Sequence, residues 1–165
     1  MKLIDKILTE AQLMEVGNNI EHSVPYKHEI TRKLTNSQDE ISKYVFRIDG
    51  LDYETLIVER QSISWKYNSV MGTDNSISWF DVSFRVFDED YHQIVNNPKT
   101  VYRVLNTVAK IILDYSKQTG RKHFSMTPSS ESRATIYKRF LQLLGAKFTE
   151  IPGKSGGCNR ILFII

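Results

Sequence analysis

The spacing of apolar residues along this 165-residue chain first predicts a helix and then loses its period. Apolar residues recur at helical intervals at the start of the chain, at Leu3, Ile4, Ile7, Leu8 and Ala11. The polar stretch that follows shows no clear period and is interpreted as a connector. We therefore divide the chain into an N-terminal helix with its connector, residues 1–42, and a folded domain, residues 43–165.

From Lys43 onward, apolar and polar residues alternate, which predicts β-strands. The stretches "KYVFRIDG" and "YETLIVER" flank the turn residues Asp49 and Gly50, a combination typical of a β-hairpin. We expect a third strand within "SISWKYNSV". A long fourth strand is predicted in "ISWFDVSFRVF", which is rich in β-branched and aromatic residues.

In the last part of the chain, helical and strand patterns alternate. One helix ends at Gly120 and carries an apolar stripe formed by Val101, Val104, Leu105, Val108, Ile111, Ile112 and Tyr115. A short strand, "RKHFSMTP", precedes the helix "SSESRATIYKRFLQLLG", which capping serines open and Gly145 closes. Two final strands, "AKFTEI" and "NRILFII", flank "PGKSGG", which lacks Walker spacing and is interpreted as a hairpin turn. This order predicts an α/β fold with a mixed, mainly antiparallel sheet and helices on both faces.

Composition and charge narrow the classes of function. No apolar run approaches the roughly 20 residues that span a bilayer, so we expect no membrane association. The single cysteine, Cys158, excludes an internal disulfide and suits a reducing compartment, so a cytoplasmic location is expected. Residues 101–165 carry 11 basic and 3 acidic side chains, which favours a phosphate-bearing partner but equally fits a solvated basic face.

The polar turn in "IVNNPKTVYRVLNTV" opens the long helix that follows it. Backbone N–H groups at a helix start lack intrahelical partners, and those of Lys99 to Arg103 are placed to hold a phosphate. Loops of this kind usually contain glycines, whereas this one has Asn96, Asn97, Pro98 and Lys99. The residues leave three interpretations open: a cofactor loop, the remnant of one, or a plain turn.

The segment from Ile77 to Ile165 resembles the Gcn5-related N-acetyltransferase (GNAT) family. In that family a long strand leads into a pyrophosphate-binding loop and helix, followed by a short strand and a second helix. In "SRATIYKRFLQLLGAKF", Ala134, Tyr137 and Gly145 match the pattern of that second helix. The resemblance implies acetyl-CoA as cofactor, bound by Asn97, Lys99, Thr100, Val101, Tyr102 and Arg103.

The chain is more similar still to GNAT-like proteins of tailed bacteriophages. "NNPKTVYRVLNTV" matches the second half of their loop and helix, but Asn97 and Lys99 stand where those proteins have glycines. "MKLIDKILTEA" resembles the capsid-targeting leader of internal head proteins, with Leu8-Thr9-Glu10 as a prohead-protease site. The resemblance implies cleavage after Glu10, phage head or other virion proteins as partners, and a place in the host cytoplasm or the virion.

The family mechanism gives roles to two residues. Tyr137 matches the tyrosine that protonates the departing thiolate, although it also suits a core position on an apolar stripe. Asp81 is the candidate base, although it shares a strand face with Arg85 that is equally explained as solvated. The four histidines, His22, His28, His92 and His123, are scattered without ligand spacing, so no metal site is expected.

Three functions follow in order of preference. The first is a phage-encoded GNAT-fold protein of the virion head with weak or lost acyltransferase activity, because the loop glycines are missing. The second is an active acetyl-CoA-dependent N-acetyltransferase. The third is a virion protein that contacts DNA without sequence specificity through Lys117, Arg121, Lys122, Arg133, Lys138, Arg139 and Lys154.

Overall fold

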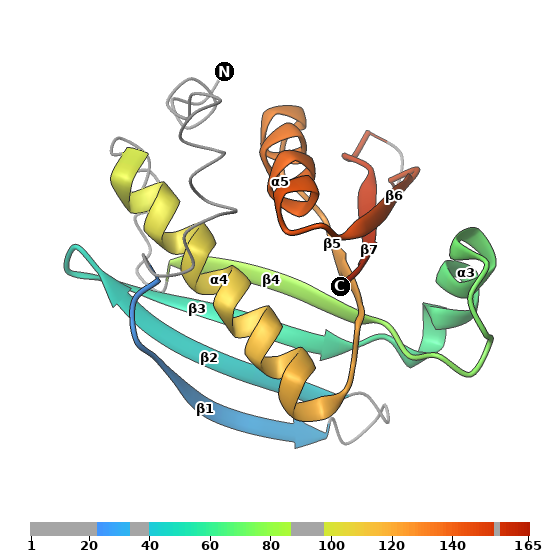
Figure 1. Cartoon of the computed structure of the whole chain (residues 1–165), viewed down its shortest axis with the longest axis horizontal. Coiled ribbons are helices and arrows are strands. Elements are labelled where there is room, and N and C mark those ends of the chain that lie inside the picture. The colour runs from blue at the N-terminus through green and yellow to red at the C-terminus, as the bar shows by residue number, and fades with distance from the viewer. Residues whose placement is uncertain (1–22, 34–39, 87–97, 154–155) are drawn as a thin grey trace.

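The computed structural model describes residues 23–33, 40–86, 98–153 and 156–165, which form one mixed sheet with three helices (Figure 1). Seven described strands lie in the order β1-β2-β3-β4-β5-β7-β6. The strands are β1 (Tyr26–Lys33), β2 (Glu40–Ile48), β3 (Leu51–Glu59), β4 (Phe80–Val86), β5 (His123–Met126), β6 (Lys147–Ile151) and β7 (Arg160–Ile164). The helices are α3 (Gln61–Met71), α4 (Pro98–Thr119) and α5 (Glu131–Leu143). The expected α/β fold is confirmed.

The sheet is antiparallel except at its centre. The hairpin of β2 and β3 is closed by a two-residue turn, because Ile48 pairs directly with Leu51. Asp49 and Gly50 take the positive φ angles, 51° and 81°, that this tight turn requires, so the predicted hairpin is confirmed. The one parallel pair, β4 with β5, is joined by the crossover helix α4.

Helices cover both faces of the sheet, as expected. Helix α4 lies across β1–β4, and α5 lies beside β5–β7 (Figure 1). Both pack into the larger core together with alternate residues of β7, Ile161 and Phe163. The next residue, Leu162, faces the other way and packs with Tyr67 of α3 and with Trp79. Helix α3 therefore lies on the face opposite α4 and α5.

The structure corrects the sequence interpretation at two places. The stretch "SISWKYNSV", residues 62–70, was expected to hold a third strand but lies within α3, whose buried residues Ser64, Tyr67 and Asn68 follow helical spacing. The connector contains β1, and β2 begins before residue 43, so the boundary at residues 42 and 43 cuts a strand. A register shift between His28 and Ile30 breaks the alternation in β1, which hid this strand from the pattern.

The helix expected at residues 1–11 lies outside the described residues. The five elements expected from residue 98 onward are confirmed as α4, β5, α5, β6 and β7. None of the helices in the described ranges combines the length and apolar character needed to span a membrane.

Candidate functional site

A pocket lies where the two parallel strands diverge. Strands β4 and β5 pair at Phe80 with Phe124 and at Asp81 with Ser125, and no described residue pairs with the rest of β4 on that side. The pocket has an empty volume of about 630 Å³, counted with its open mouth. The described residues that line it come from β3, β4, α4 and α5: Tyr53, Phe84, Arg85, Val86, Val101, Val104, Leu105, Arg133, Ile136 and Tyr137.

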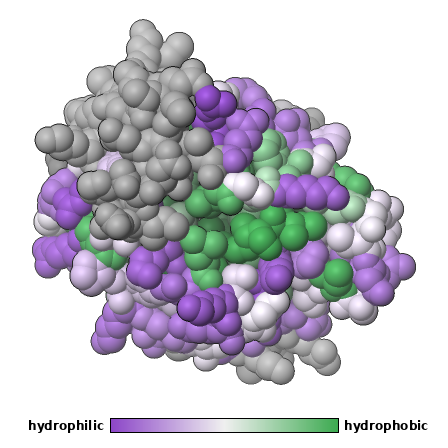
Figure 2. Space-filling view, viewed as in Figure 1, coloured by the Kyte–Doolittle hydropathy of each residue, from purple (hydrophilic) through white to green (hydrophobic). Residues whose placement is uncertain are grey.

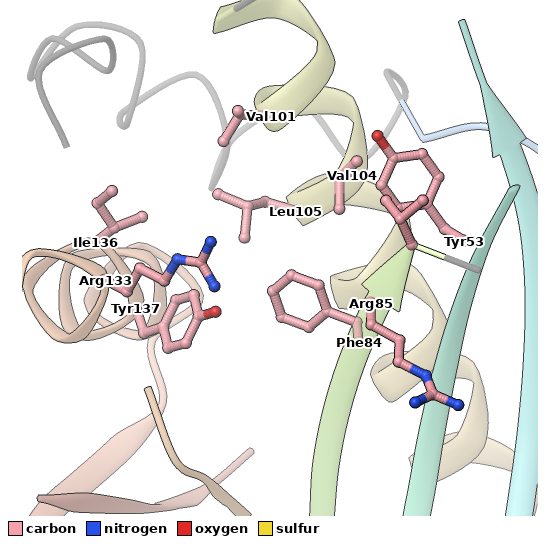
Figure 3. A pocket seen from close by; sticks show the side chains of 10 residues that line it. Tyr53, Phe84, Arg85, Val101, Val104, Leu105, Arg133, Ile136 and Tyr137 are labelled. Carbon is pink, nitrogen blue, oxygen red and sulfur yellow. The ribbon is translucent and has the colours of Figure 1, made fainter. Parts of the chain in front are cut away.

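The walls of this pocket are mainly apolar. Figure 2 shows hydrophobic residues gathered at the centre of this face, between the positions of α4 and α5 in Figure 1. The side chains of Val101, Val104 and Leu105 reach the pocket from α4, and Phe84 lies opposite them on β4 (Figure 3). A ligand body without charges would gain the usual hydrophobic stabilisation on entering these walls.

Polar groups enter the pocket from α5 (Figure 3). Arg133 and Tyr137 are one helical turn apart on α5, so both side chains point from the same helix face. On the opposite side, Tyr53 is 2% exposed and its hydroxyl has no hydrogen-bond partner. This unpaired hydroxyl is closed off within the core and lies apart from Arg133 and Tyr137 (Figure 3), so the polar groups that face the pocket space come from α5.

The expected acid, Tyr137, lines the pocket. Its ring packs against Phe84, with centroids 5.8 Å apart. Burial raises the pKa of the Tyr137 phenol, and the neighbouring Arg133 opposes this shift in part. At neutral pH the phenol therefore stays protonated and can donate a hydrogen bond or a proton.

The expected base, Asp81, lies on the other face of the sheet. Its carboxylate accepts a hydrogen bond from the Arg60 Nε at 2.6 Å and another from the Ser125 hydroxyl. The guanidinium of Arg160 lies 3.7 Å from the same carboxylate. Because Asp81 and Tyr137 are on opposite faces, the structure does not bring the two candidate catalytic residues together. No described residue that lines the pocket is a carboxylate or a histidine.

The expected cofactor residues at the start of α4 are partly engaged within the protein. The Thr100 hydroxyl donates to Asp49 Oδ2, and Arg103 Nη1 lies 3.4 Å from Asp49 Oδ1. Val101 lines the pocket and Tyr102 packs against the core. Lys99 lies in the first turn of α4, and Asn97 lies outside the described residues. Asp49 thus places a fixed negative charge beside the helix start, where a phosphate would need positive potential.

Several basic side chains of the last part of the chain are neutralised. Arg121 pairs with Glu40 at 2.6 Å, and Lys138 pairs with Glu150 at 3.3 Å. Lys154 lies outside the described residues. Of the seven cations assigned to the DNA-binding interpretation, Arg133 lines the pocket. These pairs leave less unbalanced charge than the sequence count indicates.

The structure holds no described cluster for metal binding. Within residues 23–33, 40–86, 98–153 and 156–165, no three His, Cys, Asp or Glu side chains gather closely enough to hold an ion. His123 instead packs edge-on against Trp79, with centroids 5.1 Å apart. Cys158 is a partly buried free thiol.

Sequence reasoning missed two residues of this site. Arg133 was counted only as a surface cation, although its place four residues before Tyr137 puts both on one helix face. Asp49 was interpreted only as a turn residue, and nothing local to the turn shows that it meets α4, because 51 residues separate it from Thr100. Helical spacing shows that Arg133 shares a face with Tyr137, but no local signal shows that Asp49 meets α4.

The fold and the pocket together define a class: an open, mixed α/β sheet with a mainly apolar pocket at its diverging parallel strands. No family model matches the chain, and neither a curated protein nor a solved structure is significantly similar to it.

Proposed function

We propose that this protein is a GNAT-like protein of a tailed bacteriophage that binds a coenzyme A thioester and has weak or no acyltransferase activity. The observation that carries the proposal is the pocket between β4, α4 and α5 with the Tyr137 phenol in its wall. The order of the described elements supports it: strand β4, helix α4, the short strand β5 and helix α5. Ligands of open α/β sheets bind at such points beyond the carboxyl ends of parallel strands.

Weak or absent transfer follows from the surroundings of the pocket. An amine nucleophile needs a group that removes its proton, and the described pocket residues offer no carboxylate or imidazole for this. Asp81 is held by Arg60 and Ser125 on the far face of the sheet. The side chains at Asn97 and Lys99 replace the glycines that would let the backbone approach a pyrophosphate.

Association with a phage head belongs to the same proposal but has a separate basis. It rests on the leader-like residues 1–11, which lie outside the described part of the chain, and it stays a prediction. Transfer to an amine is the second candidate, and the Tyr137 phenol in the pocket wall is the feature that favours it. The titration with acetyl-CoA described below distinguishes a protein with weak or no acyltransferase activity from an active enzyme.

Calorimetric titration with acetyl-CoA tests the proposal directly. We expect a dissociation constant of about 0.1 mM or weaker, because the helix start lacks glycines and is flanked by Asp49. Replacing Asn97 and Lys99 together by glycine should strengthen binding, since their side chains no longer separate the phosphates from the backbone N–H groups. The matched control, Asn97→Ala with Lys99→Gln, removes the same charge but keeps side chains at both positions and should give no gain.

Two further variants decide between binding and catalysis. Asp81→Asn should leave binding unchanged, because Asp81 faces away from the pocket. The native protein is an active N-acetyltransferase if it binds acetyl-CoA at micromolar concentration, acetylates an amine, and is slowed by Tyr137→Phe. That result would replace the proposal of weak or no acyltransferase activity. If neither the native protein nor the glycine variant binds at millimolar concentration, the coenzyme A proposal is wrong.

A further inference from the structure

Arg133 places a positive charge in a pocket that is otherwise mainly apolar. Its Nη1 donates to the Ser129 hydroxyl at 2.9 Å, and no described carboxylate forms an ion pair with it. The other arginine of the pocket, Arg85, differs because it pairs with the buried carboxylate of Glu54. A guanidinium has five N–H donors, so most of those of Arg133 remain available to a ligand.

The neighbours of Arg133 extend this donor set. Figure 3 shows the Arg133 guanidinium and the Tyr137 hydroxyl side by side, both pointing from α5 into the pocket. Beyond them, Phe84, Leu105 and Ile136 supply apolar wall. The arrangement therefore fits a ligand with an apolar chain and one anionic end.

We propose that the pocket binds an acyl chain that ends in a free carboxylate, with Arg133 and Tyr137 as the donors to that carboxylate. This inference rests on the proposed binding of a coenzyme A thioester and adds the chemical class of the acyl group that the thioester carries. In this pose the Tyr137 phenol donates to the carboxylate and is not available to a departing thiolate, which accords with weak or absent transfer.

A carboxylate fits this place better than a phosphate of the cofactor. The planar guanidinium can pair with either group through two parallel hydrogen bonds. A diphosphate, however, carries more negative charge than one arginine neutralises, and the apolar walls provide no further compensation. In coenzyme A the pantetheine arm also separates the phosphates from the acyl end.

The experiment compares ligands and variants by calorimetry. The ligands are succinyl-CoA and acetyl-CoA, which differ in the terminal carboxylate, and octanoate and octanamide, which carry no coenzyme. The variants are Arg133→Gln, Arg133→Lys and the control Arg139→Gln, which removes the same charge from α5 at a position outside the described pocket lining. The native protein should bind succinyl-CoA about ten- to a hundredfold more tightly than acetyl-CoA.

Arg133→Gln should abolish this preference, Arg133→Lys should keep part of it, and Arg139→Gln should keep all of it. Equal binding of both thioesters by the native protein overturns the carboxylate inference and leaves the coenzyme A proposal standing. An equal loss for both thioesters in Arg133→Gln assigns Arg133 to a phosphate, which also overturns the inference. Binding of octanoate but of neither thioester, lost in Arg133→Gln, supports the carboxylate site and refutes the coenzyme A proposal.

Discussion

At the scale of single residues, polar groups fix how α3 meets the sheet. The fully buried Trp79 donates from Nε1 to Asn68 Oδ1 at 2.7 Å, and its backbone N–H donates to the Ser64 hydroxyl at 3.0 Å. Asn68 also donates to the Ile77 carbonyl at 2.9 Å. Because these groups are buried, each bond avoids the cost of an unpaired polar atom, so they set the position of α3.

His123 gives a prediction on pH at this scale. Burial lowers the pKa of its imidazole below the ordinary value, and Lys122 lowers it further. The unfolded chain takes up this proton near pH 6.5, before the folded protein does, so the free energy of unfolding should fall as pH drops from about 7 through that range. Below the folded pKa, the contribution of His123 becomes constant.

Urea denaturation at about pH 7.5 and about pH 5.5 measures this effect in the native protein and in His123→Gln. The variant should lose less stability between the two pH values, since the other histidines contribute equally to both proteins. An identical loss in both proteins would contradict the assignment to His123.

At the scale of elements, α5 carries both polar groups of the proposed site, and its start is held by a cap. The Ser130 hydroxyl accepts a hydrogen bond from the Arg133 backbone N–H at 3.2 Å. Ser130 has extended backbone angles, as N-cap residues do. The cap therefore fixes the first turn of the helix, from which the Arg133 side chain reaches the pocket.

Ser130→Ala should lower the free energy of unfolding by about 1 kcal/mol, because one N–H at the helix start loses its acceptor. Ser130→Asp should retain stability, since a carboxylate also accepts that bond and its charge suits the N-terminal end of a helix. Ser129→Ala is the control for the loss of a hydroxyl outside the cap and should change stability less. Chemical denaturation of the three variants checks this order, and a Ser130→Ala protein as stable as the native one would exclude the cap.

At the scale of the whole molecule, β5 joins the two halves of the sheet. It lies between β4 and β7, and Phe124 on β5 is fully buried. Its ring stacks on Phe163 with centroids 5.6 Å apart and lies against Phe80 and Tyr115. The larger core is therefore continuous across both halves, and we expect the described domain to unfold in one transition.

Phe124→Ala should lower the free energy of unfolding by about 3–5 kcal/mol, because it leaves a cavity among Phe80, Tyr115 and Phe163. Trp65→Ala is the control: it also removes an aromatic ring, but Trp65 is 59% exposed, so the change should stay within about 0.5 kcal/mol. Thermal and urea unfolding of both variants measure the difference. Two separate transitions in the native protein would show that the halves are independent.

The sequence by itself determined the elements whose signals are local. The apolar stripe of α4, the capping serines of α5 and the turn at Asp49 and Gly50 each depend on residues a few positions apart, and all three features appear as predicted. The alternation in β4 also placed Asp81 and Phe80 on opposite faces.

Only the tertiary structure decided the rest, because it depends on residues far apart in the chain. Residues 61–71 form a helix that packs its Tyr67 onto Leu162 and Trp79 on one face of the sheet, and they do not pair with a strand. Helix α5, which follows β5, packs on the face of the sheet opposite to Asp81. Asp81 and Tyr137 therefore lie on different sides of the sheet. Arg133 gained its place in the pocket in the same way, because periodicity tells which residues share a face but not what that face meets.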